Sequence, residues 1–152
     1  MAETLGTLCD KLTIVKLKQW HASDPGAQAS LAAQETRLQE EIDAYVRDAA
    51  AGRIPSAHLT FAANKVYRKE GNPVADVSGG IGDIFAQLAD VNCRLWHVQE
   101  SVYEFESVPP DRKDGVVKQL AVLNLERTRC IDQLDLEFQK LLAPSPGART
   151  TD

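Results

Sequence analysis

The chain has 152 residues and a formal net charge of −5, and 43% of its residues are apolar. These values are typical of a single soluble globular domain that can bury a core of ordinary size. The negative balance disfavours a general nucleic-acid binder or a membrane-surface binder, because both carry a basic face. No apolar run approaches the roughly 18 residues that span a bilayer, and the N-terminus shows no secretory signal pattern. We therefore expect a cytoplasmic protein.

Two helices are predicted in the first third of the chain. The first runs from about residue 3 to residue 23, and its apolar positions recur at three- and four-residue steps: Leu5, Leu8, Leu12 and Val15. The stretch "SDPGAQAS" stops it, because Pro and Gly break a helix while Ser or Asp caps the next one. The second helix is predicted from about residue 28 to residue 51, and Gly52 is its expected stop.

Residues 53–80 are predicted to form a long irregular connector, since they contain two prolines and three glycines. A third helix begins near Ile81 and repeats apolar residues without a break to Phe105, which predicts a continuous packing seam. The stretch "SVPPDRKDG" is expected to turn the chain before a fourth helix at about 114–142. Residues 1–143 are thus predicted to be one helical domain, followed by a disordered tail at 144–152.

The three cysteines are expected to be small buried apolar side chains. Cys9, Cys93 and Cys130 all lie within apolar patterns, and no two of them have the spacing of a metal-ligand pair. An odd number of unpaired cysteines is typical of a reducing compartment, which agrees with a cytosolic location.

An internal repeat becomes visible when residues 5–21 are placed above residues 81–97. Five of the seventeen columns are identical, and they include the two scarce residues of a Trp-His pair: Gly6/Gly82, Leu12/Leu88, Val15/Val91, Trp20/Trp96 and His21/His97. This pattern predicts two related helical hairpins, at about 3–52 and 81–142, which bury their apolar faces against one another. The predicted fold class is therefore all-α, a four-helix bundle of two hairpins joined by the connector. Its helical seams also favour a homodimer.

Three motifs resemble those of an uncharacterised group of bacterial all-helical proteins. They are "LGTLCDKLTIVKLKQWH", "LADVNCRLWHVQE" and "LNLERTRCIDQLD". The patterns that they resemble are Asp-Lys-Leu-(Ser/Thr)-Ile, Asn-x-x-Leu-Trp-x-x-Glu and Leu-Asn-x-x-Arg followed by Ile-Asp, and in the second one Gln99 stands at the position of the glutamate. The resemblance covers about half of the chain and implies a helical, cytoplasmic bacterial protein of unknown function. The chain departs from the commonest pattern at Gln99-Glu100, where an acidic pair usually follows the tryptophan, so the likeness implies no metal role there.

The repeated Trp-His pairs allow two interpretations. In the first, each tryptophan packs between the hairpins and each histidine makes a local hydrogen bond. In the second, His21 and His97 converge across the pseudo-two-fold axis as an acid–base pair or as two metal ligands. Neighbouring residues on a helix point about 100° apart, so Trp and His of one pair cannot face the same partner squarely.

Arg127 interrupts the apolar series of the fourth helix, Leu120, Leu123, Cys130 and Leu134. A buried arginine needs a carboxylate or a bound anion. The structural interpretation is an ion pair with Asp90, Glu100 or Asp10, whereas the functional one is an anion site. The candidate ligand-binding residues are Asn92, Trp96, His97, Asn124 and Arg127. The secondary candidates are Asp10, Trp20, His21 and Glu100.

A metal centre is the weakest of the chemical interpretations. The chain contains no Glu-x-x-His and no His-x-x-x-His, which are the spacings that place two ligands on one helix face. Asp10 and His21 lie eleven residues apart, roughly 16 Å along a helix, and cannot share one ion. No metal ligand and no cofactor are therefore predicted.

Three functions remain open from the sequence. The first is a non-enzymatic helical binding or assembly protein, dimeric and cytosolic, with no nucleic-acid or membrane partner. The second is an enzyme or sensor for a small anionic ligand, such as a phosphate compound or sugar nucleotide, bound near Arg127. The third is a metal-binding helical bundle. The sequence leaves it uncertain whether the protein is an enzyme and favours the interpretation that it is not.

Overall fold

The computed structural model describes residues 2–61 and 76–143, and within them the protein is all-α, with four long helices and no strand. The predicted fold class is thereby confirmed. The long helices are α1 (Leu5–His21), α2 (Pro25–Ala50), α3 (Ile81–Tyr103) and α4 (Pro110–Leu142). Two single-turn 3₁₀ helices follow α2 and α3, η1 (Ser56–His58) and η2 (Phe105–Ser107).

Short polar side chains set the beginnings of α1 and α2. Thr4 accepts a hydrogen bond from the backbone N–H of Thr7, whose hydroxyl in turn accepts one from the backbone N–H of Thr4. Asp24 caps α2 through the N–H of Ala27, and Pro25 fills the first helical position, where no N–H is needed. Gly52 follows the end of α2 with φ of 75°, so the predicted glycine stop is present.

Two helix starts were predicted too late. α2 begins at Pro25 instead of about residue 28, and α4 begins at Pro110 instead of about residue 114. The cause is the same in both cases. Proline is compatible with the first turn of a helix, so both helices begin at the proline itself and not a few residues after it.

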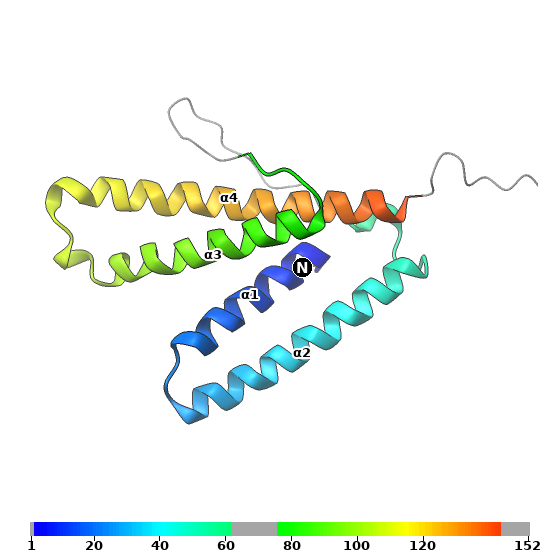
Figure 1. The fold of residues 1–152 in the computed structure, drawn as a ribbon, viewed down its shortest axis with the longest axis horizontal. Coiled ribbons are helices and arrows are strands. Elements are labelled where there is room, and N and C mark those ends of the chain that lie inside the picture. The colour runs from blue at the N-terminus through cyan, green and yellow to red at the C-terminus, as the bar shows by residue number, and fades with distance from the viewer. Residues whose placement is uncertain (1, 62–75, 144–152) are drawn as a thin grey trace, which may run out of the picture.

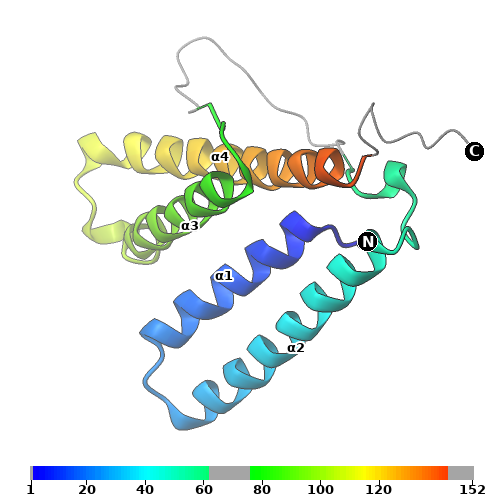
Figure 2. The ribbon, with the colours of Figure 1, turned by 45° about the vertical axis from the view of Figure 1, so that its right-hand side comes forward.

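The two antiparallel pairs α1–α2 and α3–α4 do not form a square bundle. α1 packs against all three other helices, whereas α2 packs mainly on α1. Figure 1 and Figure 2 both show α1 between α2 and the α3–α4 pair, and the α1–α2 turn diverges from α3 and α4. Among the four described helices, none lies over one long side of α1 (Figure 1).

The core has two parts. One lies at the N-terminal end of α1, where residues from all four helices and from the segment after α2 meet: Leu5, Ala49, Leu59, Ile84, Leu134 and Phe138. The other lies between α3 and α4 and contains much of the predicted seam: Leu88, Val91, Leu95, Val98, Leu123 and Cys130. Apolar burial therefore anchors the beginning of α1 more firmly than its end.

The cysteine prediction holds for one residue of three. Cys130 is buried and Cys9 is half-buried, but Cys93 is exposed. Cys93 follows the buried pair Val91 and Asn92 on α3, and one further residue turns the side chain by about 100° toward solvent. The prediction that Cys93 is a core residue was wrong for this reason.

The predicted tail, 144–152, and the middle of the predicted connector, 62–75, lie outside the described residues. None of the helices in the described part of the chain combines the length and the hydropathy that a bilayer crossing requires.

Candidate functional site

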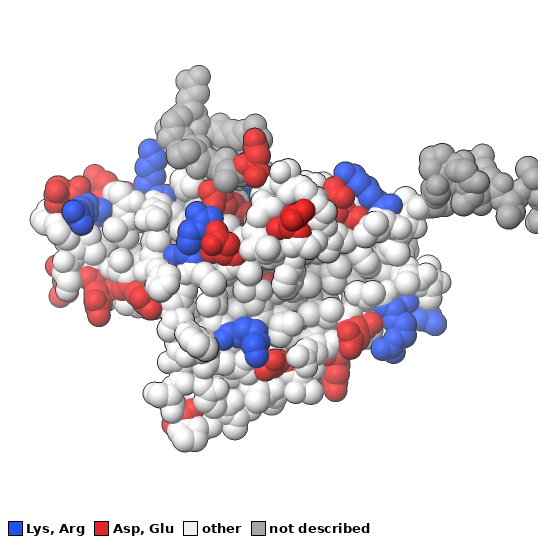
Figure 3. Space-filling view, viewed as in Figure 1, with Lys and Arg blue, Asp and Glu red and all other residues white. Residues whose placement is uncertain are grey.

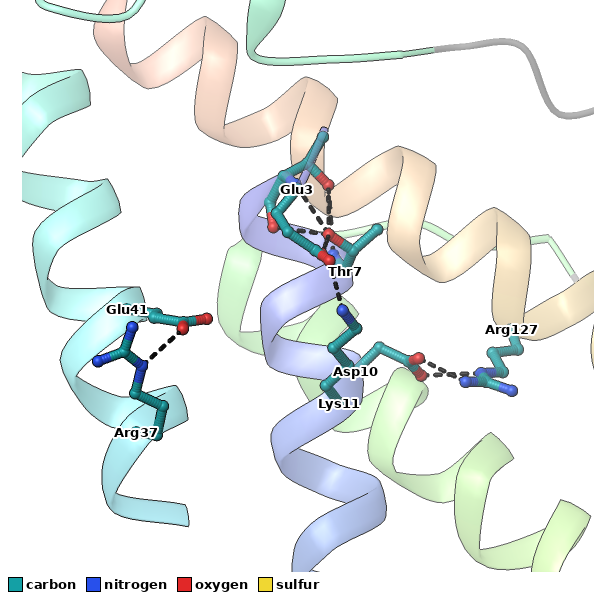
Figure 4. Close-up of polar contacts among 8 residues, drawn as sticks. Glu3, Thr7, Asp10, Lys11, Arg37, Glu41 and Arg127 are labelled. Atoms are coloured by element: carbon teal, nitrogen blue, oxygen red, sulfur yellow. Dashed lines mark hydrogen bonds and ion pairs between the residues drawn. The ribbon is translucent and has the colours of Figure 1, made fainter. Parts of the chain in front are cut away.

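Asp10, Asn92 and Arg127 form a polar cluster where α1, α3 and α4 meet. Arg127 donates from Nε to Asp10 Oδ1 at 2.8 Å and from Nη2 to Asp10 Oδ2 at 2.5 Å (Figure 4). Asn92 Nδ2 donates to Asp10 Oδ1 at 3.0 Å. Each of the three residues lies in one of the three motifs quoted above, and the two that donate to Asp10 are 82 and 117 residues away from it in the chain.

The cluster identifies the carboxylate partner of Arg127. Among the three acids that the sequence allows, it is Asp10, because Asp90 pairs with Arg94 at 3.0 Å and Glu100 accepts from Trp96 Nε1 at 3.1 Å. The Asp10 side chain is 7% exposed and that of Arg127 is 34% exposed. The hydrogen bonds to Asp10 raise the pKa of the Arg127 guanidinium above its usual value, so the guanidinium stays charged.

His21 and His97 do not meet. The His21 ring stacks on the indole of Trp96, with centroids 4.5 Å apart and planes 19° apart, and His21 Nδ1 lies 2.8 Å from Leu17 O. His97 points to solvent and its Nδ1 lies 3.7 Å from Glu100 Oε2. The interpretation in which the two histidines form an acid–base or metal pair is therefore wrong.

The two tryptophans of the repeat have different environments. Trp96 is half-buried and bridges the hairpins through His21, whereas Trp20 is 85% exposed. The expectation that both tryptophans pack between the hairpins is correct for Trp96 only. Trp20 stands one residue before the end of α1, where the α1–α2 turn diverges from α3 and α4 (Figure 1 and Figure 2), and this position agrees with its exposure.

This difference leads to a prediction about stability. Trp96→Ala should lower the free energy of unfolding by about 1–2 kcal/mol, because it removes an aromatic stack and the apolar contacts around it. Trp20→Ala should change it by less than about 0.5 kcal/mol. Urea unfolding of the two variants, read by circular dichroism at low protein concentration, measures both values. Equal losses would contradict the separate environments of the two residues.

A cavity of about 630 Å³ lies between α1 and the α3–α4 pair. It is lined by Ile14, Lys18, His21, Asn92, Leu95, Trp96, Gln99, Glu100, Tyr103, Leu120, Asn124 and Arg127. Four of the five leading candidates line it, and so do two secondary candidates, His21 and Glu100. His97, Trp20 and Asp10 are not among the lining residues, although Asp10 holds Arg127 from behind.

Two further cavities adjoin the first along α1. One, of about 620 Å³, lies between α1 and α2 and shares Ile14, Lys18 and Arg127 with the first. The other, of about 460 Å³, lies at the α1–α2 turn and shares Lys18, His21 and Trp96 with the first. We call this continuous concave surface the trough. Its floor is the α1 stripe Lys11, Ile14, Lys18 and His21, and its walls are α2 on one side and α3–α4 on the other.

Sequence reasoning missed Lys18, Tyr103 and Glu126. Lys18 and Tyr103 line the first cavity. An exposed lysine gives no signal in a single sequence, whereas Tyr103 stands seven residues after Trp96 and so lies on the same face of α3. Glu126 is buried and accepts from Arg94 Nη2 at 3.4 Å. A signal for Glu126 was present, because it stands three residues after Leu123 and four before Cys130, in the seam itself.

A second buried acid, Asp135, supports the N-terminus of α1. Its Oδ1 accepts a 2.7 Å hydrogen bond from the backbone N–H of Gly6, which has no partner within its own helix. Burial raises the pKa of Asp135 to about 6, although hydrogen bonds from Thr4 and Gly6 act in the opposite direction. Burial also raises the pKa of the neighbouring Cys9 thiol to about 11, so Cys9 stays protonated and unreactive at neutral pH.

The raised pKa of Asp135 predicts a pH-dependent stability. The folded-state pKa lies above the unfolded value, so the proton on Asp135 stabilises the fold fully below about pH 4. That contribution is lost as the pH rises through 6. Relative to wild type, Asp135→Asn should therefore gain about 2 kcal/mol between pH 4 and pH 7.5. Urea unfolding at both pH values measures the difference, and a constant offset between the two proteins would contradict it.

The charges around the trough do not indicate a metal or nucleic-acid site. In residues 2–61 and 76–143, no three His, Cys, Asp or Glu side chains lie close enough to hold one metal ion. Basic and acidic side chains lie next to each other over the face shown in Figure 3, instead of gathering by sign. This mixed pattern is typical of a solvated surface.

Comparison of the chain with models of known protein families, with curated proteins and with solved structures gives no match. Fold and site define an all-α, four-helix protein with a trough between its hairpins. Its function is inferred from this geometry.

Proposed function

We propose that the protein is a non-enzymatic helical binding protein whose binding surface is the trough. The observation that carries this proposal is the position of α1, which is packed on two sides while its Lys11–Ile14–Lys18 stripe forms the floor of adjoining cavities. Clefts of 300–1,000 Å³ between helices are typical binding sites. Half-buried Ile14 gives the floor an apolar centre with polar walls, which is the composition of such sites.

The polar cluster supports a binding role over a catalytic one. Arg127 is already neutralised by Asp10, and Glu100 is engaged by Trp96 Nε1, so these side chains hold the walls of the trough in place. A general base or nucleophile needs a hydrogen-bonded activating partner. The His21 ring is hydrogen-bonded to a backbone carbonyl and stacked on Trp96, and the other imidazole of the repeat points to solvent beside Glu100. Within the described residues, neither imidazole is thus paired with a nucleophile of the cavity.

An enzyme or sensor for a small anionic ligand remains the second candidate, favoured by the presence of Asn92, Asn124 and Arg127 in one cavity.

We further propose that the protein is cytosolic and belongs to the bacterial group that its motifs resemble. We also propose that it arose by duplication of one hairpin and is present as a homodimer. Exposed aromatic side chains such as Trp20 favour self-association. Light scattering should then give about twice 16.7 kDa at micromolar concentration, and a constant mass of one chain would contradict the dimer.

A thermal-shift screen against metabolites and amphipathic peptides tests the binding role. The variant Ile14→Arg places a long charged side chain on the trough floor, and Val117→Arg makes the same kind of change at an exposed position on α4. We expect compounds that raise the melting temperature of wild type and of Val117→Arg but not of Ile14→Arg. The binding role is contradicted if no compound shows this pattern, or if a compound that binds there is converted into a product detected by mass spectrometry.

A further inference from the structure

The cavity between α1 and α3–α4 has two chemically different walls. Lys18 on α1 and Arg127 on α4 form a cationic side, and Trp96 and Tyr103 on α3 form an aromatic side. Trp96 and Tyr103 are seven residues apart, which is two helical turns and roughly 10 Å along one face of α3. A ligand in this cavity therefore meets flat apolar surface from one direction and hydrogen-bond donors from the other.

The cationic side retains unused donors. Arg127 engages Asp10 through Nε and Nη2, which leaves the two N–H groups of Nη1 without an acceptor among residues 2–61 and 76–143. Lys18 lines all three cavities of the trough, and its ammonium group forms no ion pair with a carboxylate in the same described ranges. By contrast, the neighbouring Lys11 and Lys16 are paired with Glu3 and Glu35. Lys18 is thus placed to bind an anionic group from outside the chain.

Trp96, the inner part of the aromatic side, is held in a fixed orientation. Trp96 Nε1 donates to Glu100 Oε1 at 3.1 Å, and the His21 ring stacks on the indole. Tyr103 extends the wall toward the open end and is 82% exposed, so its ring is available to a ligand. A planar ring is the group that gains most from such a wall, because offset or tilted aromatic pairs are favourable beyond their buried area.

We propose that this cavity binds a small molecule in which a planar aromatic ring carries one anionic group, a carboxylate or a phosphate. The ring lies against Trp96 and Tyr103, and the anionic group is bound by Lys18 and the free end of Arg127. The volume of about 630 Å³ suits a ligand of this size. Glu100 also lines the cavity, and its negative charge disfavours a second anionic group near the aromatic wall. The inference rests on the proposed binding function and specifies its ligand class.

A bare inorganic anion fits the site less well. Asp10 offsets the charge of Arg127 with two hydrogen bonds, so the positive charge at the cavity that no carboxylate of the described residues pairs with is that of one exposed lysine, Lys18. A single exposed lysine holds an anion weakly in water. The aromatic surface must therefore supply much of the affinity, which is why the ring and the anionic group are required together.

Isothermal titration calorimetry with two matched probe sets tests the ligand class. 2-Naphthoate is compared with cyclohexanecarboxylate, which lacks the aromatic ring, and adenosine 5′-monophosphate is compared with adenosine and with inorganic phosphate. We expect at least one ring-plus-anion probe to bind at least about tenfold more tightly than its controls. Failure of both probes to bind at millimolar concentration would overturn the inference. Equal binding of inorganic phosphate would overturn it too, and would identify a simple anion site.

Three variants locate the binding. Lys18→Gln and Tyr103→Ser change exposed side chains, so the fold is retained and each should weaken the ring-plus-anion probe about five- to tenfold. Lys118→Gln removes the same charge from an exposed position that lines a different cavity, on α3 and α4, and should have no effect. Equal effects of Lys18→Gln and Lys118→Gln would show non-specific attraction and overturn the site. If trough-dependent binders in the thermal-shift screen all lack this chemistry, the ligand class fails while the binding function stands.

Discussion

Arg127→Met is expected to lower the free energy of unfolding by about 3–5 kcal/mol at pH 7.5, because it leaves a buried carboxylate without its counter-charge. The carboxylate is that of Asp10, whose side chain is 7% exposed. Asn92 alone would then hydrogen-bond it, through one N–H of its amide. Among the polar contacts between α1 and the α3–α4 pair, the one to Arg127 should thus contribute most to stability.

Replacing the other member of the ion pair, Asp10, should lower the free energy of unfolding by less. Asp10→Asn leaves Arg127, which is one-third exposed and can turn its guanidinium toward water, so we expect a loss of about 1–2 kcal/mol. In the double variant neither charge remains, and Arg127→Met should cost less in the Asp10→Asn background than alone. Urea unfolding of the four proteins gives this cycle. Additive losses would show that the two side chains do not stabilise one another.

Arg37→Met is the matched control. Arg37 also forms an ion pair, through Nε to Glu41 at 3.0 Å, but its side chain is 74% exposed (Figure 4). Exposed pairs four residues apart on a helix contribute about 0.3–0.5 kcal/mol, so this variant should be nearly neutral. A comparable loss in both arginine variants would mean that burial is not the cause.

The helical content of the protein was predictable because its signals are local. The unbroken three- and four-residue steps of α3 identify Ile84, Leu88, Val91 and Leu95 as buried, and they are. The same local pattern marks Arg127 as out of place and so predicts a partner. It narrows that partner to three acids, but only the crossing of α1 over α3 and α4 selects Asp10.

The arrangement of the hairpins and most of the cavity were not predictable. A repeat in sequence places equivalent residues on equivalent helix faces, but it does not give them equivalent neighbours. Trp20 lies near the end of α1, where the α1–α2 turn diverges from α3 and α4 (Figure 1), and it is exposed. Trp96 lies within α3, which packs on α4, and it contacts His21 of the other hairpin. In the sequence Lys18 does not differ from an ordinary solvated lysine, and its place in the trough follows only from the positions of α2 and α3 on either side of it.

Because equivalent positions of the repeat have different neighbours, opposite effects are expected for alanine substitutions at two equivalent glycines, Gly6 and Gly82. Gly6→Ala should lower the free energy of unfolding by about 2–4 kcal/mol, because a Cβ there would lie 2.6 Å from Ile131 O and 2.9 Å from Asp135 Oδ1. The first contact is with backbone and cannot rotate away, so α1 and α4 must separate. Their separation would also weaken the hydrogen bond from Gly6 to Asp135.

Gly82→Ala is the internal control, since Gly82 is the counterpart of Gly6 in the second copy of the repeat. A Cβ at Gly82 meets nothing within 4 Å, and alanine favours the helix by up to about 1 kcal/mol. A small rise in the free energy of unfolding is therefore expected for Gly82→Ala and a large fall for Gly6→Ala, both measured by urea unfolding. Two falls of similar size would mean that α3 also needs a close backbone approach at this position, and that the two hairpins are more alike than their contacts indicate.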